Sequence, residues 1–464
     1  MSDLHVVILA AGKGTRMKSA LPKVLHRVGG RPMIDHVLAA TAILEPRTTT
    51  VVVGHEADTL TDRLAAHKYL TIVVQEPQLG TGHALLATEH VYRRASGILL
   101  LLSGDVPLLS PNTLKKLVNH HVAHAAALTV LTAVLPSALG YGRVVRTGER
   151  IARIVEETDV SPTEQEIREI NSGIYAFALD GLFDALHGIA TSNAQREYYL
   201  PDLVSIYSEA GRRVETVTAD NADEIRGINT RLDLEEVNHI VNTNKNEQLM
   251  RSGVTIRDRA TAYIDPEVQI GQDTIIHPGV SIEGRTTIGA SCEIHSGVRI
   301  VNSHLGDRVV IHNHCVISDA TIADEARIGP FAHLRKHADI RERARVGNFV
   351  ELKQTVLGAG SKSMHLAYLG DATIGEKVNI GAGTITCNYD GDRKSQTTIE
   401  DGAFIGSDTQ LLAPVRVGQG AYVGSGTTVR ENVPAGALAV SAGKQRNIEG
   451  WVQKKRRASG PAKR

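Results

Sequence analysis

An aliphatic residue returns every sixth position through much of the second half of the chain. The period runs from Ile264 to Ile300 without interruption and, after two five-residue steps, continues to Leu352. A small or β-branched residue stands two places before most of these positions, as Val280 stands before Ile282. Alternate residues of a strand share one face, so both positions are expected to face an interior. An amphipathic helix would instead require apolar residues at i, i+3, i+4 and i+7.

Short strands joined by corners every six residues are typical of the hexapeptide form of the left-handed parallel β-helix. Three strands make one coil, and burying each stacked aliphatic side chain contributes roughly 1.5–3 kcal/mol. Two polar stretches depart from the period, at residues 359–368 and 387–394. Insertions in a solenoid usually loop out on one face and carry function, so we expect two functional loops there.

The first half of the chain shows a different pattern, in which apolar runs alternate with helix-prone segments. We expect strands at residues 5–12, 51–53, 72–74, 98–102 and 128–134, and added strands between residues 141 and 177 that wall a pocket. Strands that alternate with helices favour a doubly wound, Rossmann-like α/β fold. Residues 230–250 are polar, with Leu234, Val237 and Val241 along one side, which predicts a helical arm.

These patterns divide the chain into four segments. Residues 1–229 form the α/β domain, 230–251 the helical linker, 252–437 the β-helix and 438–464 a basic tail. A chain of 464 residues is too long for one ordinary core, which agrees with at least two domains.

Composition narrows the class of protein. Lys+Arg and Asp+Glu are equal at 51 each, so neither a nucleic-acid coat nor a membrane-binding surface is indicated. Cys292 and Cys315 fall on small positions of the repeat and are expected to be buried packing residues rather than disulfide partners. No apolar run approaches the about 18–20 residues that span a bilayer. No signal peptide is indicated either, so we expect a cytoplasmic protein.

A glycine-rich loop follows the first predicted strand. It reads LAAGKGTRM over residues 9–17 and is followed by PKVL. Gly12 and Gly14 permit backbone N–H groups to approach a phosphate closely, and Arg16 and Lys23 supply positive charge. Met17 stands where the last glycine of G-x-G-x-x-G belongs, so the glycines alone leave a tight β–α turn open as an alternative.

The end of the fourth predicted strand is a candidate cation site. Asp105 follows a run of leucines, at the carboxyl end of a buried strand, where open α/β sheets bind their ligands. A carboxylate there suits Mg²⁺ on substrate phosphates. The alternative is a turn-forming aspartate before Val106 and Pro107.

Together these segments resemble the sugar-1-phosphate nucleotidyltransferases. LAAGKGTRM with PKVL is similar to the family's nucleotide loop, Gln75 with LGTGHA to its uracil-recognising stretch, and GDVPL to its metal-binding strand end. The resemblance implies that Arg16 and Lys23 are catalytic and that Asp105 and Asn229 hold Mg²⁺. It implies a nucleotide and UDP-N-acetylglucosamine site made of Leu9, Ala10, Ala11, Gly12, Lys23, Gln75, Gly80, Thr81, Ser103, Gly104, Asp105, Gly142, Glu156, Asn171 and Asn229.

The reaction implied by this resemblance is attack of a sugar-1-phosphate oxygen on the α-phosphorus of UTP, with release of pyrophosphate. Positioning and charge neutralisation carry most of such catalysis. No residue of this domain is required as a general base.

The first polar departure contains SKSMHLAYLGD, which resembles the catalytic loop of glucosamine-1-phosphate N-acetyltransferases, and the second contains CNYDG, which resembles their sugar-binding loop. The resemblance implies that His365 is the general base, since imidazole suits that role near pH 7. It implies a sugar-phosphate site of Arg335, Lys353, Tyr368 and Asn379. It implies an acetyl-CoA site of Ala382, Asn388, Tyr389, Ser407 and Ser425.

With both halves taken together, nearly the whole chain is similar to the bifunctional N-acetylglucosamine-1-phosphate uridyltransferases and glucosamine-1-phosphate N-acetyltransferases. This similarity implies acetyl transfer to glucosamine-1-phosphate, then uridylyl transfer to the product, which gives a precursor of peptidoglycan and other cell-envelope polymers. It also implies a homotrimer, because the acetyl-transfer sites of this family form between neighbouring solenoids. Small-molecule substrates are the partners expected, with no nucleic acid and no membrane.

Some positions depart from the family pattern. Ser103 stands where many members have tyrosine, and His333 where many have arginine. Ala442 replaces an arginine that reaches the CoA phosphates, so we expect Lys444, Arg446 or the basic tail to take that role. The single tryptophan, Trp451, is expected to pack over the same cleft or over a neighbouring chain.

Two other functions remain open from the sequence. One is a sugar-1-phosphate nucleotidyltransferase whose β-helix serves only regulation or assembly, which the two polar departures with His365 argue against. The other is a non-catalytic scaffold built on the same two folds, which Asp105, Asn229 and the complete LAAGKGTRM loop argue against.

Overall fold

The computed structural model describes residues 3–54, 58–441, 443 and 447–458. Ala442, Lys444 and Arg446, which bear on the expected CoA site, lie outside these residues. The chain divides into two compact units, Met1–Val241 and Asn242–Arg464. Every helix among the described residues is too short or too polar to cross a membrane.

The first unit is built on a nine-stranded sheet. Its main path is β11 (Val214–Thr218), β7 (Leu128–Val134), β10 (Glu169–Ala178), β6 (Ile98–Ser103), β1 (Leu4–Ala10), β4 (Thr48–Val53) and β5 (Leu70–Val74). Off this path, β8 (Arg143–Thr147) pairs with β10, and β9 (Arg150–Val155) pairs with β8. A separate small hairpin joins β2 (Arg27–Val28) to β3 (Arg31–Pro32). The strand expected at residues 5–12 ends at Ala10, because the glycine-rich loop begins there.

Strand direction in this sheet is mixed. β1 pairs parallel with β4 and β6, as expected for strands connected through helices. β10 pairs antiparallel with both β6 and β7 and supplies one of the added strands predicted between residues 141 and 177.

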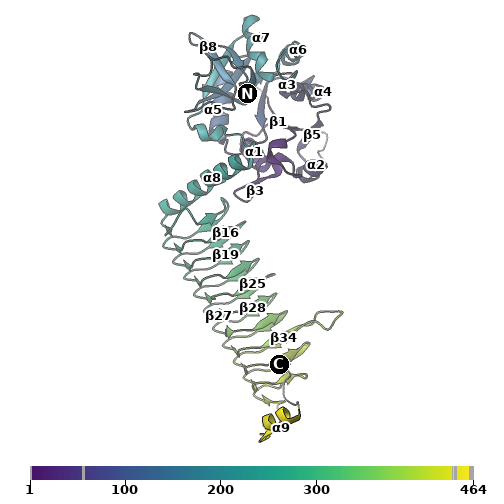
Figure 1. Ribbon diagram of the computed structural model, residues 1–464, viewed down its shortest axis with the longest axis vertical. Coiled ribbons are helices and arrows are strands. Elements are labelled where there is room, and N and C mark those ends of the chain that lie inside the picture. Colours follow the sequence, from purple (N-terminus) through teal and green to yellow (C-terminus); the bar gives the residue numbers. More distant parts are fainter. Residues whose placement is uncertain (1–2, 55–57, 442, 444–446, 459–464) are drawn as a thin grey trace. The chain divides into compact units, whose positions relative to one another are not determined.

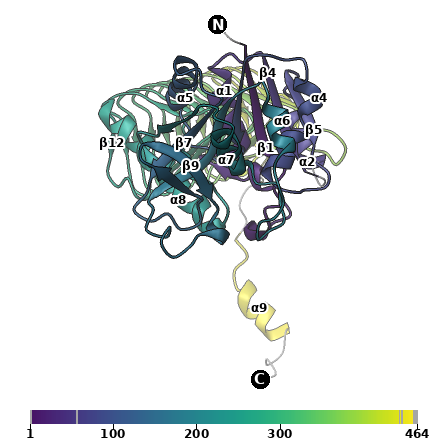
Figure 2. The same cartoon turned by 90° about the horizontal axis from the view of Figure 1, so that it is seen from above.

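Helices cover both faces of the sheet, so the predicted doubly wound α/β fold is confirmed (Figure 2). Alternate residues of β1 enter opposite cores, with Val6 and Ile8 in one and Val7 in the other. The first core includes side chains of α1 (Met33–Ala42), α2 (Asp58–Leu64) and α5 (Pro111–Ala123). The second includes α3 (Thr81–Leu86), α4 (Glu89–Tyr92), α6 (Leu182–His187) and α7 (Leu203–Glu209).

The predicted helical arm is α8 (Arg231–Arg251), and the division between the units falls within it. In the first unit, Val237 is buried with Met17 and Ile228. In the second, the Asn246 amide donates to the carbonyl of Ala262 at 2.9 Å and Lys245 Nζ donates to that of Val268 at 2.7 Å. These polar residues of α8 therefore satisfy the open backbone of the first coil.

The second unit is a parallel β-helix of three sheets, whose coils are stacked one on the next in Figure 1. The first β-helix sheet comprises β12 (Thr255–Ile256), β15 (Ile275–Ile276), β18 (Glu293–Ile294), β21 (Val310–Ile311), β24 (Arg327–Ile328), β27 (Arg345–Asn348), β30 (Lys362–His365), β33 (Asn379–Ile380), β36 (Phe404–Ile405), β39 (Tyr422–Val423) and β41 (Leu438–Ala439). The last of these strands belongs to the segment that was expected to be a basic tail.

The other two sheets follow the same order along the solenoid. The second β-helix sheet comprises β13 (Tyr263–Ile264), β16 (Ser281–Glu283), β19 (Arg299–Val301), β22 (Val316–Ser318), β25 (His333–Arg335), β28 (Glu351–Lys353), β31 (Tyr368–Gly370), β34 (Ile385–Cys387), β37 (Gln410–Leu412) and β40 (Thr428–Val429). The third comprises β14 (Gln269–Ile270), β17 (Thr287–Ile288), β20 (His304–Leu305), β23 (Thr321–Ile322), β26 (Asp339–Ile340), β29 (Val356–Leu357), β32 (Ala372–Ile374), β35 (Thr397–Ile399) and β38 (Val415–Val417). The helix α9 (Trp451–Ala458) follows the β-helix in the chain.

The period-six residues form the interior of this unit, as the sequence predicts. Ile282, Ile300 and Ile317 are each fully buried and pair in register on consecutive strands of the second β-helix sheet. Cys292 and Cys315 are buried and free, so their predicted role as packing residues is confirmed. Burial raises the pKa of the Cys315 thiol to about 11, which leaves that thiol unreactive at neutral pH.

The loop predicted at residues 359–368 does not exist. This segment forms β30 and begins β31, and Ser363 pairs in register with Val346. The aliphatic pattern is interrupted only because Ser363, which is fully buried, fills the interior position of an ordinary coil.

The second departure is a true insertion. Ile374 pairs with Ile399, although one coil earlier Leu357 pairs with Ile374, so the intervening coil is much longer. The extra residues lie between β34 and β35, and an antiparallel bridge between Tyr389 and Lys394 closes the loop.

The interior residues are expected to dominate the stability of the β-helix. Ile317→Ala should lower the free energy of unfolding by about 2–5 kcal/mol, because it leaves a cavity in a closed core. The measurement is the midpoint of urea unfolding followed by circular dichroism. The neighbouring Val316→Ala, at a position 41% exposed, should change the free energy by no more than about 0.5 kcal/mol. Equal losses in the two variants would contradict this assignment of the interior.

Candidate functional site

A cavity of about 440 Å³ opens where β1 and β6 end, at the carboxyl edge of the sheet. An adjoining cavity of about 620 Å³ shares Ala10, Ala11 and Gly12 with it. The predicted site residues that line the first cavity are Leu9, Ala10, Ala11, Gly12, Lys23, Gln75, Gly80, Thr81, Ser103 and Asp105. The fold thus gathers most of the predicted nucleotide site around one hollow.

Close backbone approach explains Gly14, in the glycine-rich loop, and Gly80, in the cavity wall. Gly14 has φ +59°, and a Cβ there would lie 2.9 Å from Lys23 Cβ. Gly80 has φ +101°, and a Cβ there would lie 2.8 Å from the carbonyl oxygen of Tyr198. Its own carbonyl accepts a hydrogen bond from the buried Gln75 amide at 3.0 Å. At both positions only glycine allows the positive φ together with the close approach of the neighbouring atoms.

Three segments far apart in the sequence converge on one ammonium group. Lys23 Nζ donates to Asp105 Oδ2 and, at 3.0 Å, to Asn229 Oδ1. Arg16 also donates to Asn229 Oδ1 at 3.0 Å. The backbone N–H of Asn229 is held at 2.8 Å by the carboxylate of Asp233. The four predicted residues Arg16, Lys23, Asp105 and Asn229 therefore form one cluster.

This cluster fits the predicted metal site. The Asp105 and Asn229 oxygens point at the same ammonium nitrogen, so they already converge on a position suited to a cation. A carboxylate and an amide oxygen are ligands that Mg²⁺ prefers.

Gly142, Glu156 and Asn171 form a second group on the added strands. The backbone N–H of Asn171 donates to the Gly142 carbonyl at 2.9 Å, and a Cβ on Gly142 would lie 3.4 Å from Glu156 Oε1. Burial, with smaller effects from nearby carboxylates, raises the pKa of Glu156. The register of β10 shifts after Asn171, and a Cβ on Gly173 in this bulge would lie 3.6 Å from Ser103 Oγ. The bulge thus places β10 against the cavity wall.

Two residues of the cavity wall were not identified from the sequence. Gln78 lines both cavities, and its side-chain amide donates to the Ala11 carbonyl at 2.5 Å. Its position between Gln75 and the LGTGHA stretch is a signal that could have indicated it. Glu197 also lines the first cavity, but it comes from a distant segment that shows no pattern in the sequence.

Four of the predicted acetyl-transfer residues form a column at one corner of the β-helix. Ser363, Ile380, Ile405 and Val423 pair in turn on consecutive strands of the first β-helix sheet. His365, Ala382, Ser407 and Ser425 each stand two places after one of these residues. They therefore occupy the same place in four successive coils.

His365 has a partner that sequence reasoning missed. It pairs in register with Asn348, and its Nδ1 lies 2.9 Å from Asn348 Oδ1. A carbonyl oxygen can only accept, so Nδ1 carries the proton and Nε2 retains its lone pair. His365 is exposed, so this lone pair is available to a ligand.

Lys353, Tyr368 and Asn388 gather around Asp371, a second residue that the sequence did not reveal. Lys353 is 4% exposed and its Nζ lies 2.8 Å from Asp371 Oδ2. Burial alone would lower the pKa of Lys353, but the pairing with Asp371 outweighs it and raises that pKa. The Asn388 amide donates to the same carboxylate, and a Cβ on Gly370 would lie 2.4 Å from the Tyr368 hydroxyl and 2.9 Å from Asn388 Nδ2.

Two further predicted residues lie on strands beside these groups. Arg335 pairs in register with Lys353 and binds Glu351 at 2.7 Å. Asn379 lies on β33 between Lys362 and Phe404 of the adjacent strands.

Two exposed aromatic residues also belong to the predicted set. Tyr389 is 59% exposed in the inserted loop. Trp451 is 51% exposed, with Lys455 Nζ 5.0 Å from its ring centroid, so its packing over a CoA cleft stays a prediction.

Comparison with known proteins matches both units. Residues 6–161 match the MobA-like NTP transferase domain, 259–341 the GMPPB C-terminal domain and 396–431 the bacterial transferase hexapeptide repeats. The chain is 48% identical to the "Bifunctional protein GlmU" of Trichlorobacter lovleyi, over 98% of this chain and 99% of that protein. It is 46% identical to the protein of that name from Koribacter versatilis, over 97% of each chain. For the one from Exiguobacterium sp. the identity is 48%, over 97% of this chain and 100% of that protein.

The cluster at Lys23 generates a test of the metal site. Mn²⁺ can replace Mg²⁺ at oxygen ligands, and electron paramagnetic resonance measures the ion left free in solution. Asp105→Asn should weaken Mn²⁺ binding by about tenfold or more, because it removes the carboxylate charge. Asp220→Asn, at a side chain 81% exposed, is the matched control and should bind Mn²⁺ with the affinity of the wild-type chain. Unaltered binding by Asp105→Asn would refute the assignment.

Proposed function

The chain belongs to the family of the bifunctional GlmU proteins, and we infer from this premise that it is an enzyme with two transferase activities. The α/β unit transfers a uridylyl group from UTP to N-acetylglucosamine-1-phosphate. The left-handed β-helix transfers an acetyl group from acetyl-CoA to glucosamine-1-phosphate. The product of the second unit is the acceptor used by the first, so acetyl transfer precedes uridylyl transfer.

The observation that carries the proposal for uridylyl transfer is the convergence of Arg16, Lys23, Asp105 and Asn229 beside the cavity. Asp105 and Asn229 would hold Mg²⁺, which neutralises phosphate charge when it is bound. Lys23 and Arg16 bind the phosphates of UTP and orient the α-phosphorus toward the sugar-phosphate oxygen. Gln75, Gly80 and Thr81 on the cavity wall hold the base.

Glu156 and Asn171, on the added strands, orient the sugar and ribose hydroxyls. Attack by the sugar-phosphate oxygen forms the new P–O bond, and pyrophosphate leaves. This step requires no general base because the attacking phosphate oxygen is already anionic.

The observation that carries the proposal for acetyl transfer is the imidazole of His365 with its free Nε2 lone pair, held by Asn348 at the head of the corner column. Lys353 and Arg335 bind the sugar phosphate, and Tyr368 and Asn388 orient the sugar. Nε2 of His365 removes a proton from the 2-amino group of the sugar as the nitrogen of that amino group attacks the thioester carbonyl. The C–N bond forms, the C–S bond breaks and CoA leaves as a thiolate, which takes up the proton from the imidazolium of His365. A backbone N–H near Ser407 stabilises the oxygen that becomes anionic.

The surface beside His365 supports the proposed homotrimer. Phe331, Phe349 and Leu366 occupy equivalent corner positions of three successive coils and are 48%, 55% and 62% exposed. All three have left-handed backbones, with φ of 55°, 58° and 48°. This conformation costs a non-glycine residue about 1–2 kcal/mol.

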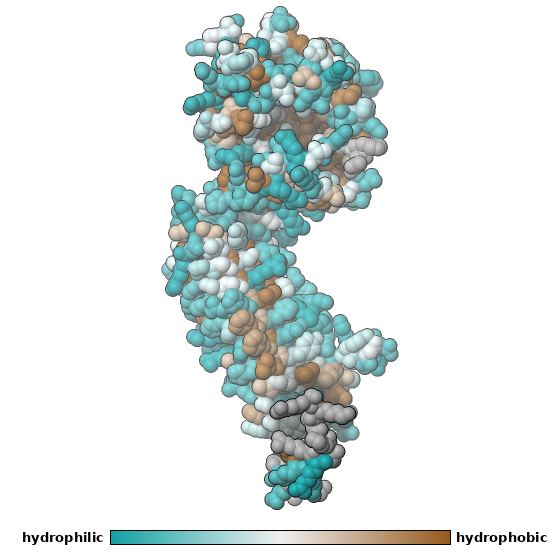
Figure 3. Space-filling model, in the orientation of Figure 1, coloured by the Kyte–Doolittle hydropathy of each residue, from teal (hydrophilic) through white to brown (hydrophobic). Residues whose placement is uncertain are grey.

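At the equivalent corner, the coil before Phe331 carries His314 and the coil after Leu366 carries Gly383. Bulky apolar side chains would not be expected at exposed positions that also require a costly backbone conformation. A second copy of the chain that covers these side chains explains why they are there. Exposed apolar side chains also gather in a row along the β-helix in Figure 3. Leu366 directly follows His365 in the chain, so the apolar strip of Phe331, Phe349 and Leu366 borders the imidazole. The acetyl-transfer site therefore lies between neighbouring subunits.

The two activities should be separable by single substitutions. His365→Ala should reduce thiol release from acetyl-CoA by about 10²–10⁴-fold, the usual contribution of a general base, and leave pyrophosphate release unchanged. Asp105→Ala should have the opposite effect. The assays are thiol release with glucosamine-1-phosphate and pyrophosphate release with UTP and N-acetylglucosamine-1-phosphate.

His365→Ala and Asp105→Ala serve as folding controls, because each should retain the activity that the other loses. If the unchanged chain released no thiol with glucosamine-1-phosphate, the acetyltransferase proposal would fail. Mg²⁺-dependent uridylyl transfer retained by Asp105→Ala would count against the metal assignment.

The trimer makes a separate prediction. Phe349→Asp should dissociate the assembly, because it buries a carboxylate in an apolar interface, and should lower acetyl transfer at least about tenfold while uridylyl transfer persists. The mass of the assembly is measured by light scattering after size exclusion. Tyr263→Asp, at an apolar side chain 63% exposed on the second β-helix sheet, is the control and should remain trimeric. A trimeric Phe349→Asp with full acetyl transfer would disprove the proposed interface.

A further inference from the structure

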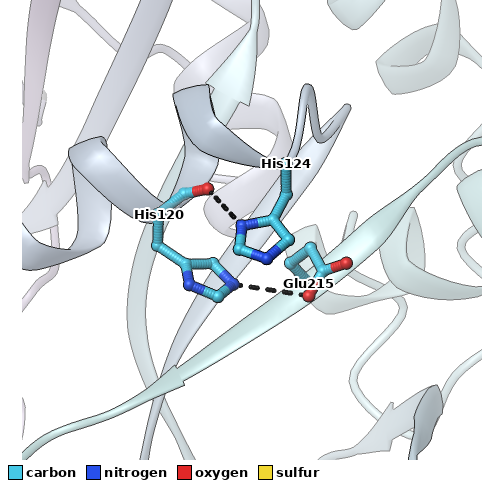
Figure 4. A group of neighbouring side chains, drawn as sticks. All are labelled: His120, His124 and Glu215. Carbon is cyan, nitrogen blue, oxygen red and sulfur yellow. Dashed lines mark hydrogen bonds and ion pairs between the residues drawn. The ribbon is translucent and has the colours of Figure 1, made fainter.

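A third group of potential ligands lies outside both proposed active sites. His120 belongs to the last turn of α5, His124 is the residue that caps this helix, and Glu215 lies on the edge strand β11 (Figure 4). Each offers one ligand atom, and these atoms lie within 4.8 Å of one another. All three residues are partly buried.

The fold brings these residues together in a simple way. His120 and His124 are four positions apart, so they share one face of the helix turn. Their rings stack with centroids 3.9 Å apart. Glu215 is opposite Thr129 in the pairing of β11 with β7, and its carboxylate points toward the two rings (Figure 4).

Hydrogen bonds from outside the group orient His124 and Glu215 for a cation. His124 Nδ1 lies 2.9 Å from the carbonyl oxygen of His120, which can only accept, so Nε2 of His124 retains its lone pair. Arg213 Nε holds Glu215 Oε1 at 2.7 Å. Glu215 Oε2 remains directed at His120 Nε2, 3.4 Å away. Second partners of this kind fix the tautomer and direction of metal ligands.

The electrostatics also favour a bound cation. The carboxylate of Glu215 supplies negative charge to the group. The C-terminal end of α5 carries the negative end of the helix dipole.

We propose that His120, His124 and Glu215 bind one divalent transition-metal ion of the Zn²⁺ class. Two imidazoles and one carboxylate are ligands typical of Zn²⁺, which accepts nitrogen readily, whereas Mg²⁺ prefers oxygen alone. The ion would join the end of α5 to the edge strand β11 and leave room for a water ligand. The site is separate from the oxygen ligands Asp105 and Asn229.

Titration of the metal-stripped full chain with Zn²⁺ in Mg²⁺-free buffer, against a chromophoric chelator, tests this proposal. The unchanged chain should bind one Zn²⁺ more per chain than the double variant His120→Asn/His124→Asn. Glu215→Gln should weaken this site by at least about tenfold, since loss of an outer partner alone typically costs 10–100-fold. Co²⁺ in place of Zn²⁺ should give visible absorption that the double variant lacks.

The β-helix provides a matched control. His277, Glu293 and His295 form the other His and Glu group with ligand atoms this close among the described residues. His277→Asn/His295→Asn removes the same number of imidazoles and should leave intact the Co²⁺ absorption that His120→Asn/His124→Asn removes. Pyrophosphate release and circular dichroism verify that both double variants fold. Equal Zn²⁺ binding by the unchanged chain and His120→Asn/His124→Asn overturns the proposal, as does loss of the spectrum in His277→Asn/His295→Asn alone.

Discussion

Register between coils is the constraint on which the second unit depends. Each interior aliphatic residue must lie directly against its equivalents in the coils before and after it, because each strand pairs in register with the strands of those coils and the interior side chains form one closely packed core. Once the interior residues are aligned, every other position of the coil is aligned as well. His365, Ala382, Ser407 and Ser425 form a column for this reason alone, since each stands two places after an interior residue.

The same constraint decides where the chain can vary. A coil tolerates a serine inside, as at Ser363, because the hydroxyl is small and the strand still pairs on both sides. It tolerates extra residues only at a corner, and the inserted loop leaves the solenoid between β34 and β35 accordingly. Asn388, at the start of that loop, is thereby brought beside Asp371 of the coil before it. The insertion completes a polar group that a regular coil could not build.

The sequence was sufficient for the folds and for the residues that carry local patterns. The six-residue period identified the β-helix core, and the glycine-rich loop identified one wall of the cavity. Asn348 and Asp371 were missed because their partners are set by pairing between coils, which leaves no local signal. Glu197 was missed because a distant segment folds onto the cavity. The loop predicted around His365 was wrong because one buried serine, Ser363, interrupts the aliphatic pattern just as an insertion would.

The first unit assembles its charges differently, by bringing three distant segments to one sheet edge. Lys23, Asp105 and Asn229 are joined by a single ammonium group, which keeps the partly buried Asp105 carboxylate paired. An unpaired carboxylate would be costly there, so the pairing can be released only when another positive charge takes the place of Lys23. The two oxygens that anchor this lysine are those proposed as Mg²⁺ ligands. Replacement of the Lys23 ammonium group by Mg²⁺ would free Lys23 for the phosphates, and Asp105 would be paired with a cation both before and after the replacement.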